Sequence, residues 1–362
     1  MKKLGCGFFV CCLVISIFIY VVYWGDNLKG IEDESSLLET PSVELSEKKV
    51  DIKSDTSQKD PISNVNLGDG LHTFIGQTVE FLVANLGEPE RKDLSAYDYE
   101  WWIYADQFAS GYLQIGVEND QIVTVYVIGE DLPTGLIQIG ATYNEISALF
   151  SFDQEVSFNI NNNSYQFKLS DDDLQMRPII QEEDVFIQLY FDLFTQKLSS
   201  IRYISPETVI KQRPYSVVYR GNLIESKPLS NQKWEEVQKG SSLQIFEITN
   251  QIRKRHQLSL LSWDEVTADV AFLHSKDMKL NEYFSHTSPE HGELTDRLKK
   301  QGILYQLAAE NIAAKYVDAI AAVEGWLNSE GHRVNMLHED FTHLGVGVYE
   351  RYYTQNFITP WK

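Results

Sequence analysis

A short sequence pattern that occurs twice constrains the fold of the first half of the chain. Residues 75–78 (IGQT) return as residues 139–142 (IGAT), and apolar residues follow both copies at the same spacing. Each copy opens with a short helical stretch and continues into strand-like segments rich in aromatic and β-branched residues. Apolar residues alternate in 113–117 and in 187–191, which is typical of a half-buried antiparallel sheet. We therefore expect residues 67–210 to form one α+β repeat domain made of two tandem copies.

The length and the charge of the chain restrict its class. A chain of 362 residues exceeds the usual size of one hydrophobic core, so we expect at least two folded parts. The formal net charge is −21, and such a field repels nucleic acid phosphates and the anionic faces of membranes. We therefore expect no nucleic acid partner, and we interpret the acidity as a well-solvated surface.

An apolar run near the N-terminus predicts a transmembrane helix. Lys2 and Lys3 precede a stretch from Leu4 to Trp24 that is just long enough to cross a bilayer. The run ends in bulky residues without a small-residue cleavage site, which favours an uncleaved, single-pass anchor (residues 1–25) in the cell membrane. The two lysines should stay in the cytoplasm, so the remainder is expected to be extracellular. All three cysteines lie in this run, so the outer part has no disulfide.

Two connecting segments separate the predicted folded parts. Residues 26–66 are rich in Asp, Glu, Ser and Lys and contain few large apolar residues, so we expect a flexible acidic stalk. Residues 211–240 form a second, polar linker, and the last domain covers residues 241–362. Its predicted helices lie at 243–256, 264–280, 294–300 and 318–328, and its predicted strands at 344–349 and 353–359. This mixture indicates an α+β domain with helices flanking a small antiparallel sheet.

Histidine is concentrated in the last domain, because seven of the eight histidines lie in residues 256–343. Among them, His286 and His332 are widely spaced from each other and from Glu310. Two imidazoles and a carboxylate suit a divalent cation such as zinc, and they equally suit general acid–base chemistry. On spacing alone, capping and surface positions explain these residues at least as well. His274 lies among apolar residues of a predicted helix, and we interpret it as a hydrogen-bonded structural histidine.

The order of motifs in residues 242–360 resembles the bacterial form of the CAP superfamily, which comprises the cysteine-rich secretory, antigen 5 and pathogenesis-related-1 proteins. The matching stretches are NQIR at 250–253, LSWD at 261–264, AFLHSKDM at 271–278, FSHTSP at 284–289, AENIA at 309–313, WLNSEGHRVNML at 326–337, GVGV at 345–348 and YTQNF at 353–357. The repeat region resembles the CAP-associated N-terminal domain that Gram-positive bacteria place ahead of such a module. The resemblance implies an α-β-α sandwich, the CAP fold, for the C-terminal domain.

The resemblance also implies a cleft with two histidines and two acidic residues, which binds zinc or another divalent cation in some members. His286 matches the first histidine and Glu310 the first acidic residue. The second acidic residue falls at Ser329, and the second histidine falls at Tyr352. His332, from the bacterial Gly-His-Arg motif, is the candidate substitute, so a metal is expected at His286 and His332. The predicted binding cleft comprises His286, Glu310, Asn311, Glu330, His332, Tyr352 and Gln355.

Two functions fit these features. We expect a membrane-anchored, outward-facing protein of a Gram-positive cell envelope whose CAP module binds an envelope or extracellular ligand, with the repeat domain as a spacer or partner surface. The alternative is a hydrolase of peptide or cell-wall material, in which a metal or His286 activates water and Glu310 is the acid–base partner, with His332 as a third catalytic candidate. The chain lacks Gly-x-Ser-x-Gly and His-Glu-x-x-His motifs, which weighs against the hydrolase. A purely structural stalk would leave the histidine motifs without a use.

Overall fold

A computed structural model describes residues 70–105, 111–130 and 132–361. All of them belong to one compact unit of the chain, residues 40–362. The predicted anchor (1–25) and stalk (26–66) lie outside the described residues. Within the described part, no helix has the length and apolar character needed to span a bilayer.

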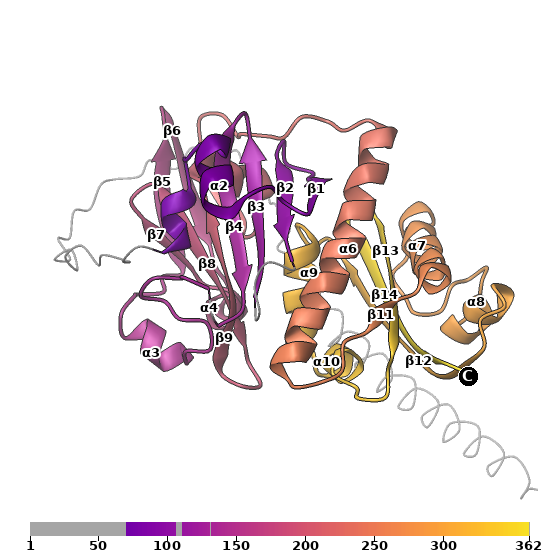
Figure 1. The fold of residues 1–362 in the computed structure, drawn as a ribbon. Coiled ribbons are helices and arrows are strands. Elements are labelled where there is room, and N and C mark those ends of the chain that lie inside the picture. The colour runs from indigo at the N-terminus through magenta and orange to yellow at the C-terminus, as the bar shows by residue number, and fades with distance from the viewer. Residues whose placement is uncertain (1–69, 106–110, 131, 362) are drawn as a thin grey trace, which may run out of the picture. The chain divides into compact units, whose positions relative to one another are not determined.

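Each copy of the repeat begins with short helical segments or a helix and continues into antiparallel strands (Figure 1). The first copy contains η1 (Leu71–Phe74), α2 (Val79–Leu86), β1 (Arg91–Leu94), β2 (Glu100–Tyr104), β3 (Tyr112–Glu118) and β4 (Gln121–Ile128). The second contains α3 (Tyr143–Ser147), β5 (Glu155–Ile160), β6 (Asn163–Lys168), α4 (Asp171–Met176), β7 (Ile179–Glu182), β8 (Val185–Asp192), β9 (Lys197–Ile204), α5 (Pro206–Gln212) and β10 (Ser216–Arg220). A seven-stranded sheet has the order β1-β2-β3-β4-β9-β8-β7, and a three-stranded sheet has the order β10-β6-β5.

The two copies make the same hydrogen bonds at equivalent positions. Gly76 donates to the carbonyl oxygen of Ile122 at 2.8 Å, and Gly140 donates to that of Leu198 at 2.9 Å. Thr78 caps α2, and Thr142 caps α3. Both glycines have a positive φ, which glycine adopts without a steric penalty. The two copies then meet where β4 pairs antiparallel with β9 in the middle of the large sheet.

The large sheet is buried on both faces, which corrects the prediction of a half-buried sheet. Leu113, Ile187 and their neighbours pack into an apolar core, as the alternation indicates. The polar residues between them are buried as well, among them Gln114, Gln188 and Arg202. The physical reason is that two parts of the chain cover this second face. A helix of the C-terminal domain covers it at Arg202, and Tyr215 with the smaller apolar core of the repeat domain covers it at Gln188. The sequence pattern could not reveal this, because the covered face is itself polar.

The C-terminal domain is a four-stranded sheet between helices. It contains α6 (Asn231–Arg255), β11 (Ser262–Trp263), α7 (Glu265–Leu280), α8 (Leu294–Lys300), β12 (Tyr305–Ala314), α9 (Ala319–Leu327), α10 (Glu330–Met336), β13 (His343–Tyr349) and β14 (Tyr352–Pro360), with strand order β11-β13-β14-β12. Gly345 and Gly347 of β13 lie directly against the backbone of α7. On the other face, Gln355 donates to Thr249 of α6 at 2.8 Å. Figure 1 shows α6 and α7 on opposite sides of this sheet, which is the layering of an α-β-α sandwich.

The segment expected as a polar linker, residues 211–240, is mostly ordered secondary structure. Strand β10 pairs with β6 and so extends the repeat domain beyond residue 210. Helix α6 begins at Asn231, where Ser230 caps it through a hydrogen bond from Lys233. The reason for the early start is that α6 packs against β1 and buries Val237, Gln238 and Gly240 ahead of the predicted start.

A buried polar network joins the repeat domain to the C-terminal domain. Glu324 of α9 is 2% exposed and accepts hydrogen bonds from Tyr126 of β4 and from Ser199 and Ser200 of β9. Arg202, fully buried on β9, lies 2.7 Å from Asp318, which caps α9. Buried polar groups need such partners because an unpaired one costs free energy.

Candidate functional site

Strand β12 presents Glu310 and Asn311 to opposite faces of the small sheet. Glu310 is paired with Asn356, and Asn311 is paired with Gln355. Successive residues of a strand point to opposite sides, so the two side chains serve different environments. Asn311 lies within β12, which spans Tyr305–Ala314.

Glu310 is the centre of a buried cluster on the α7 side. The residue is 8% exposed. Its Oε1 atom lies 3.0 Å from Nδ1 of His286, and its Oε2 atom accepts from Nη2 of Arg297 at 2.6 Å. His274 lies behind them, with Nε2 3.8 Å from Oε1 of Glu310 and 3.0 Å from the carbonyl oxygen of Ser285. Both carboxylate oxygens are therefore occupied, and Glu310 fixes the orientation of the His286 ring.

The two histidines of this cluster have different exposure. The His286 side chain is 55% exposed, so the ring edge opposite Nδ1 faces the outside of the cluster. His274 is buried, and desolvation lowers its pKa to about 4 despite the nearby Glu310 carboxylate. A neutral imidazole that bonds a backbone oxygen is the structural histidine that we expected. Its position against Glu310 adds a contact that the sequence did not reveal.

His332 approaches the cluster from α10. Its Nδ1 atom lies 2.7 Å from Oγ of Ser329, and its carbonyl oxygen accepts from Nδ2 of Asn311 at 3.1 Å. Desolvation, with the His286 charge as a second cause, lowers the pKa of His332 to about 4, so the ring is neutral at physiological pH. His332 and Gly331 lie in the first turn of α10, at its N-terminal end.

The remaining predicted cleft residues are not beside Glu310. Tyr352 is paired with Ala314, four residues along β12 from Glu310 and hence about 13 Å away. Gln355 points to the α6 side and accepts from Asn311 at 3.1 Å through its Oε1 atom. Glu330 is exposed in the first turn of α10. The structure thus brings His286, Glu310 and His332 together, with Asn311 and Gln355 as supports.

Arg297 is the member of the cluster that the sequence did not predict. It lies on α8, is 6% exposed, and its Nε and Nη1 atoms have no hydrogen-bond partner among the described residues. A buried arginine is normally paired, but the sequence does not show that Arg297 is buried, and only the fold places it on Glu310.

The residues present do not fit a divalent cation. Zinc sites use three or four nitrogen, sulfur or carboxylate donors around the ion. In the described ranges, no group of three or more His, Cys, Asp or Glu residues has the geometry to hold a metal. The carboxylate of Glu310 is already neutralised by Arg297, and a guanidinium beside the site repels a cation.

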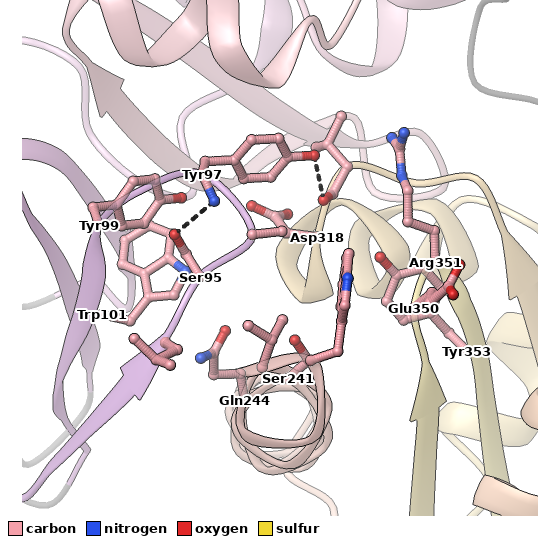
Figure 2. A pocket seen from close by; sticks show the side chains of 15 residues that line it. Ser95, Tyr97, Tyr99, Trp101, Ser241, Gln244, Asp318, Glu350, Arg351 and Tyr353 are labelled. Atoms are coloured by element: carbon pink, nitrogen blue, oxygen red, sulfur yellow. Dashed lines mark hydrogen bonds between the residues drawn. The ribbon is translucent and has the colours of Figure 1, made fainter. Parts of the chain in front are cut away.

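A small hollow between the repeat domain and the C-terminal domain lies apart from this cluster. Figure 2 shows Tyr97 reaching across it, where its hydroxyl donates to the carbonyl oxygen of Val317 at 2.9 Å. The volume of about 20 Å³ has room for roughly one water molecule. Its lining includes Ser95, Trp101, Gln244, Asp318 and Arg351. The hollow is therefore a feature of the packed interface and is too small for a ligand.

The sandwich, with Glu310 on its edge strand paired to His286 of the α7–α8 loop, defines a CAP-type domain, and sequence comparison agrees. Residues 246–359 match the cysteine-rich secretory protein family, and residues 75–215 match the CAP-associated N-terminal domain. The chain belongs to the CAP family, in the form that carries this associated domain.

Particular relatives come from Gram-positive bacteria. The membrane protein YlbC of Bacillus subtilis is 49% identical over 292 residues, which cover 81% of this chain and 84% of YlbC. The crystal structure of an extracellular SCP-domain protein from Bacillus anthracis is similar, with 46% identity and a TM-score of 0.77, covering 87% of this chain and 100% of that chain. A cysteine-rich secretory protein from Staphylococcus aureus has 25% identity and a TM-score of 0.71, covering 80% of this chain and 93% of that chain.

Proposed function

We propose that this protein is a ligand-binding module of the Gram-positive cell envelope, anchored by one N-terminal helix with its folded part outside the cell. The apolar run from Leu4 to Trp24 supports the anchor, and so does the description of YlbC as a membrane protein. The extracellular description of the Bacillus anthracis relative supports the outward orientation. The ligand is envelope or extracellular material that reaches the His286 side of the CAP domain.

One observation carries the binding role. His286 and His332 each have Nδ1 engaged inside the protein, by Glu310 and by Ser329 respectively. The Nε2 atom of each ring is therefore the atom left for a ligand. Two rings held in this way are pre-oriented hydrogen-bonding groups, and pre-orientation reduces the entropy cost of binding.

Co-sedimentation with purified peptidoglycan tests this function on the full chain in detergent micelles. We expect wild type to bind and the His286→Ala, His332→Ala double variant to bind about tenfold or more weakly, because two ligand hydrogen bonds are lost. His343→Ala is the matched control, since its ring contacts the hydroxyl of the adjacent Thr342. Equal binding by the double variant and the control would contradict the proposal.

A hydrolase is the second candidate, and the His286–Glu310 contact of 3.0 Å favours it. A carboxylate on Nδ1 holds an imidazole in the tautomer that can accept a proton at Nε2, as a general base requires. His332, with a pKa of about 4, is a weak base and fits binding better than proton transfer. Release of soluble fragments from the same peptidoglycan, absent with Glu310→Gln, would favour hydrolysis over binding alone.

A further inference from the structure

Helix α9 ends on the repeat domain. Asn328, the residue after α9, accepts from the backbone N–H of Leu193 at 2.8 Å and donates to the carbonyl oxygen of Phe191 at 2.8 Å. One side-chain amide thus satisfies a donor and an acceptor at the end of β8. This contact fixes the chain immediately before Ser329 and His332.

Helix α10 is held by the same turn. Arg333, which follows His332, donates from Nη1 and Nη2 to the two carboxylate oxygens of Asp192 at 2.9 and 3.0 Å. Its guanidinium also lies 4.6 Å from the ring centre of Phe194. A bidentate pair fixes direction as well as distance. The repeat domain therefore holds the chain both before His332, through Asn328, and after it, through Arg333.

Asp192 is a rigid anchor for this clamp. Its side chain is 4% exposed, against 11% for Arg333. Its Oδ1 atom also accepts from the backbone N–H groups of Phe194 and Thr195, at 3.0 and 3.3 Å. The carboxylate is thus part of the β8–β9 turn and cannot follow Arg333 if α10 moves.

The opposite side of α10 lies against the edge strand of the cleft. Asn335 donates to the carbonyl oxygen of Glu310 at 3.3 Å and to Oδ1 of Asn311 at 2.9 Å. Asn311 in turn donates to the carbonyl oxygen of His332. Helix α10 therefore spans the distance between the β8–β9 turn of the repeat domain and β12 of the CAP domain.

We infer that the repeat domain is a part of the cleft: its β8–β9 turn, through Asp192, positions His332 beside the His286–Glu310 pair. This goes beyond the proposed function, in which the repeat domain needs only to be a spacer or a partner surface. Asp192 is a positioning residue, because it acts through Arg333 and not on a ligand. The geometry of the cleft is measurable without any ligand, so the inference can fail or hold independently of peptidoglycan binding.

The test compares two aspartate variants in the full chain in detergent micelles. Asp192→Asn keeps an oxygen for the turn and removes the charge that Arg333 needs. Asp173→Asn is the matched control, because Asp173 is also buried and pairs with Arg177 at 2.7 Å inside the repeat domain. We expect Asp192→Asn to speed amide hydrogen exchange in α10 by about tenfold or more and to shift the ring NMR signal of His332. The control should change neither.

A purely stabilising contact gives a different result. If Asp192→Asn lowers the melting temperature as Asp173→Asn does, but leaves α10 exchange and the His332 signal as in wild type, the inference is overturned. Arg333→Lys is a second variant in case Asp192→Asn fails to fold, since lysine keeps the charge but cannot form the bidentate pair. Unchanged α10 exchange in that variant would equally overturn the inference. Partial recovery by Asp192→Glu would support it.

Discussion

The guanidinium of Arg297 lies 2.6 Å from Oε2 of Glu310, the carboxylate oxygen that His286 leaves free. The two side chains are 6% and 3% exposed. This contact places a fixed positive charge beside the carboxylate that a divalent cation would need, so these residues do not suit such a cation.

The first prediction concerns stability. Removing one partner of a buried ion pair leaves an uncompensated charge, so Arg297→Met should lower the free energy of unfolding by about 3–5 kcal/mol. Urea denaturation followed by near-UV circular dichroism measures this. The Arg297→Met, Glu310→Gln double variant should recover part of the loss, because no buried charge remains. A single variant within about 1 kcal/mol of wild type would contradict the buried pair.

The second prediction concerns zinc. Calorimetric titration of the full chain near neutral pH should give no saturable binding at one site per chain, because Arg297 already neutralises Glu310. The expectation of a metal at His286 and His332 is tested by the same experiment. One-site binding that the His286→Ala, His332→Ala double variant loses would contradict the prediction and restore a metal to the cleft.

Some of the cleft could be predicted from the sequence. His286 and Glu310 stand in recognisable motifs, and the structure places Nδ1 of His286 3.0 Å from Oε1 of Glu310. Helices α7, α8 and α9 begin and end within one residue of the predicted ranges, since their apolar spacing and the capping aspartates of α7 and α9 mark them. These signals depend only on residues that are close in the sequence, so they can be recognised without knowledge of the fold.

The rest depends on contacts between distant residues. Arg297 contacts Glu310 from α8, an ordinary amphipathic helix whose sequence does not indicate this contact. Asp192 and Arg333 are 141 positions apart, and neither residue type indicates the other. The second buried face of the large sheet is polar, so its residues have the pattern of a solvent-facing surface. A buried polar face and a solvent-facing one can be distinguished only from the packing of the folded chain.

The third prediction concerns pH. Burial raises the pKa of Glu324 to about 7, against the hydrogen bonds from Ser200 and Ser199 and the charge of Arg255; Asp192 raises it further. The folded-state pKa of Glu324 exceeds its unfolded value. The contribution of Glu324 to the free energy of unfolding is therefore fully present below pH 4.5 and is lost as the pH rises through about 7. Glu324→Gln cannot ionise, so its stability relative to wild type should rise by roughly 2 kcal/mol between pH 5 and pH 8.

Thermal unfolding at a series of pH values measures this difference. The exposed Glu236 on α6 supplies the control, because Glu236→Gln should follow the wild-type pH profile. A Glu324→Gln profile parallel to wild type over this range would show that Glu324 is not kept neutral by its surroundings.

The fourth prediction concerns the contact between α7 and the small sheet. A Cβ atom on Gly347 would lie 1.8 Å from the backbone nitrogen of Phe272, so neither side can yield without moving the helix. Gly347→Ala should therefore cost about 3 kcal/mol or more. Gly302 has a positive φ but nothing within 4 Å of its Cβ position, so Gly302→Ala should cost only about 1 kcal/mol. Equal melting temperatures for the two variants would contradict the close packing.

The central claim is that His286 and His332 meet the ligand through the ring nitrogens that the protein leaves free. NMR of the histidine ring nitrogens in the full chain, with and without solubilised peptidoglycan fragments, tests it most directly. We predict that the Nε2 signals of His286 and His332 shift together on addition of the fragments, while those of the buried His274 stay in place. Binding of the fragments with both Nε2 signals unchanged would contradict the claim and place the ligand elsewhere on the protein.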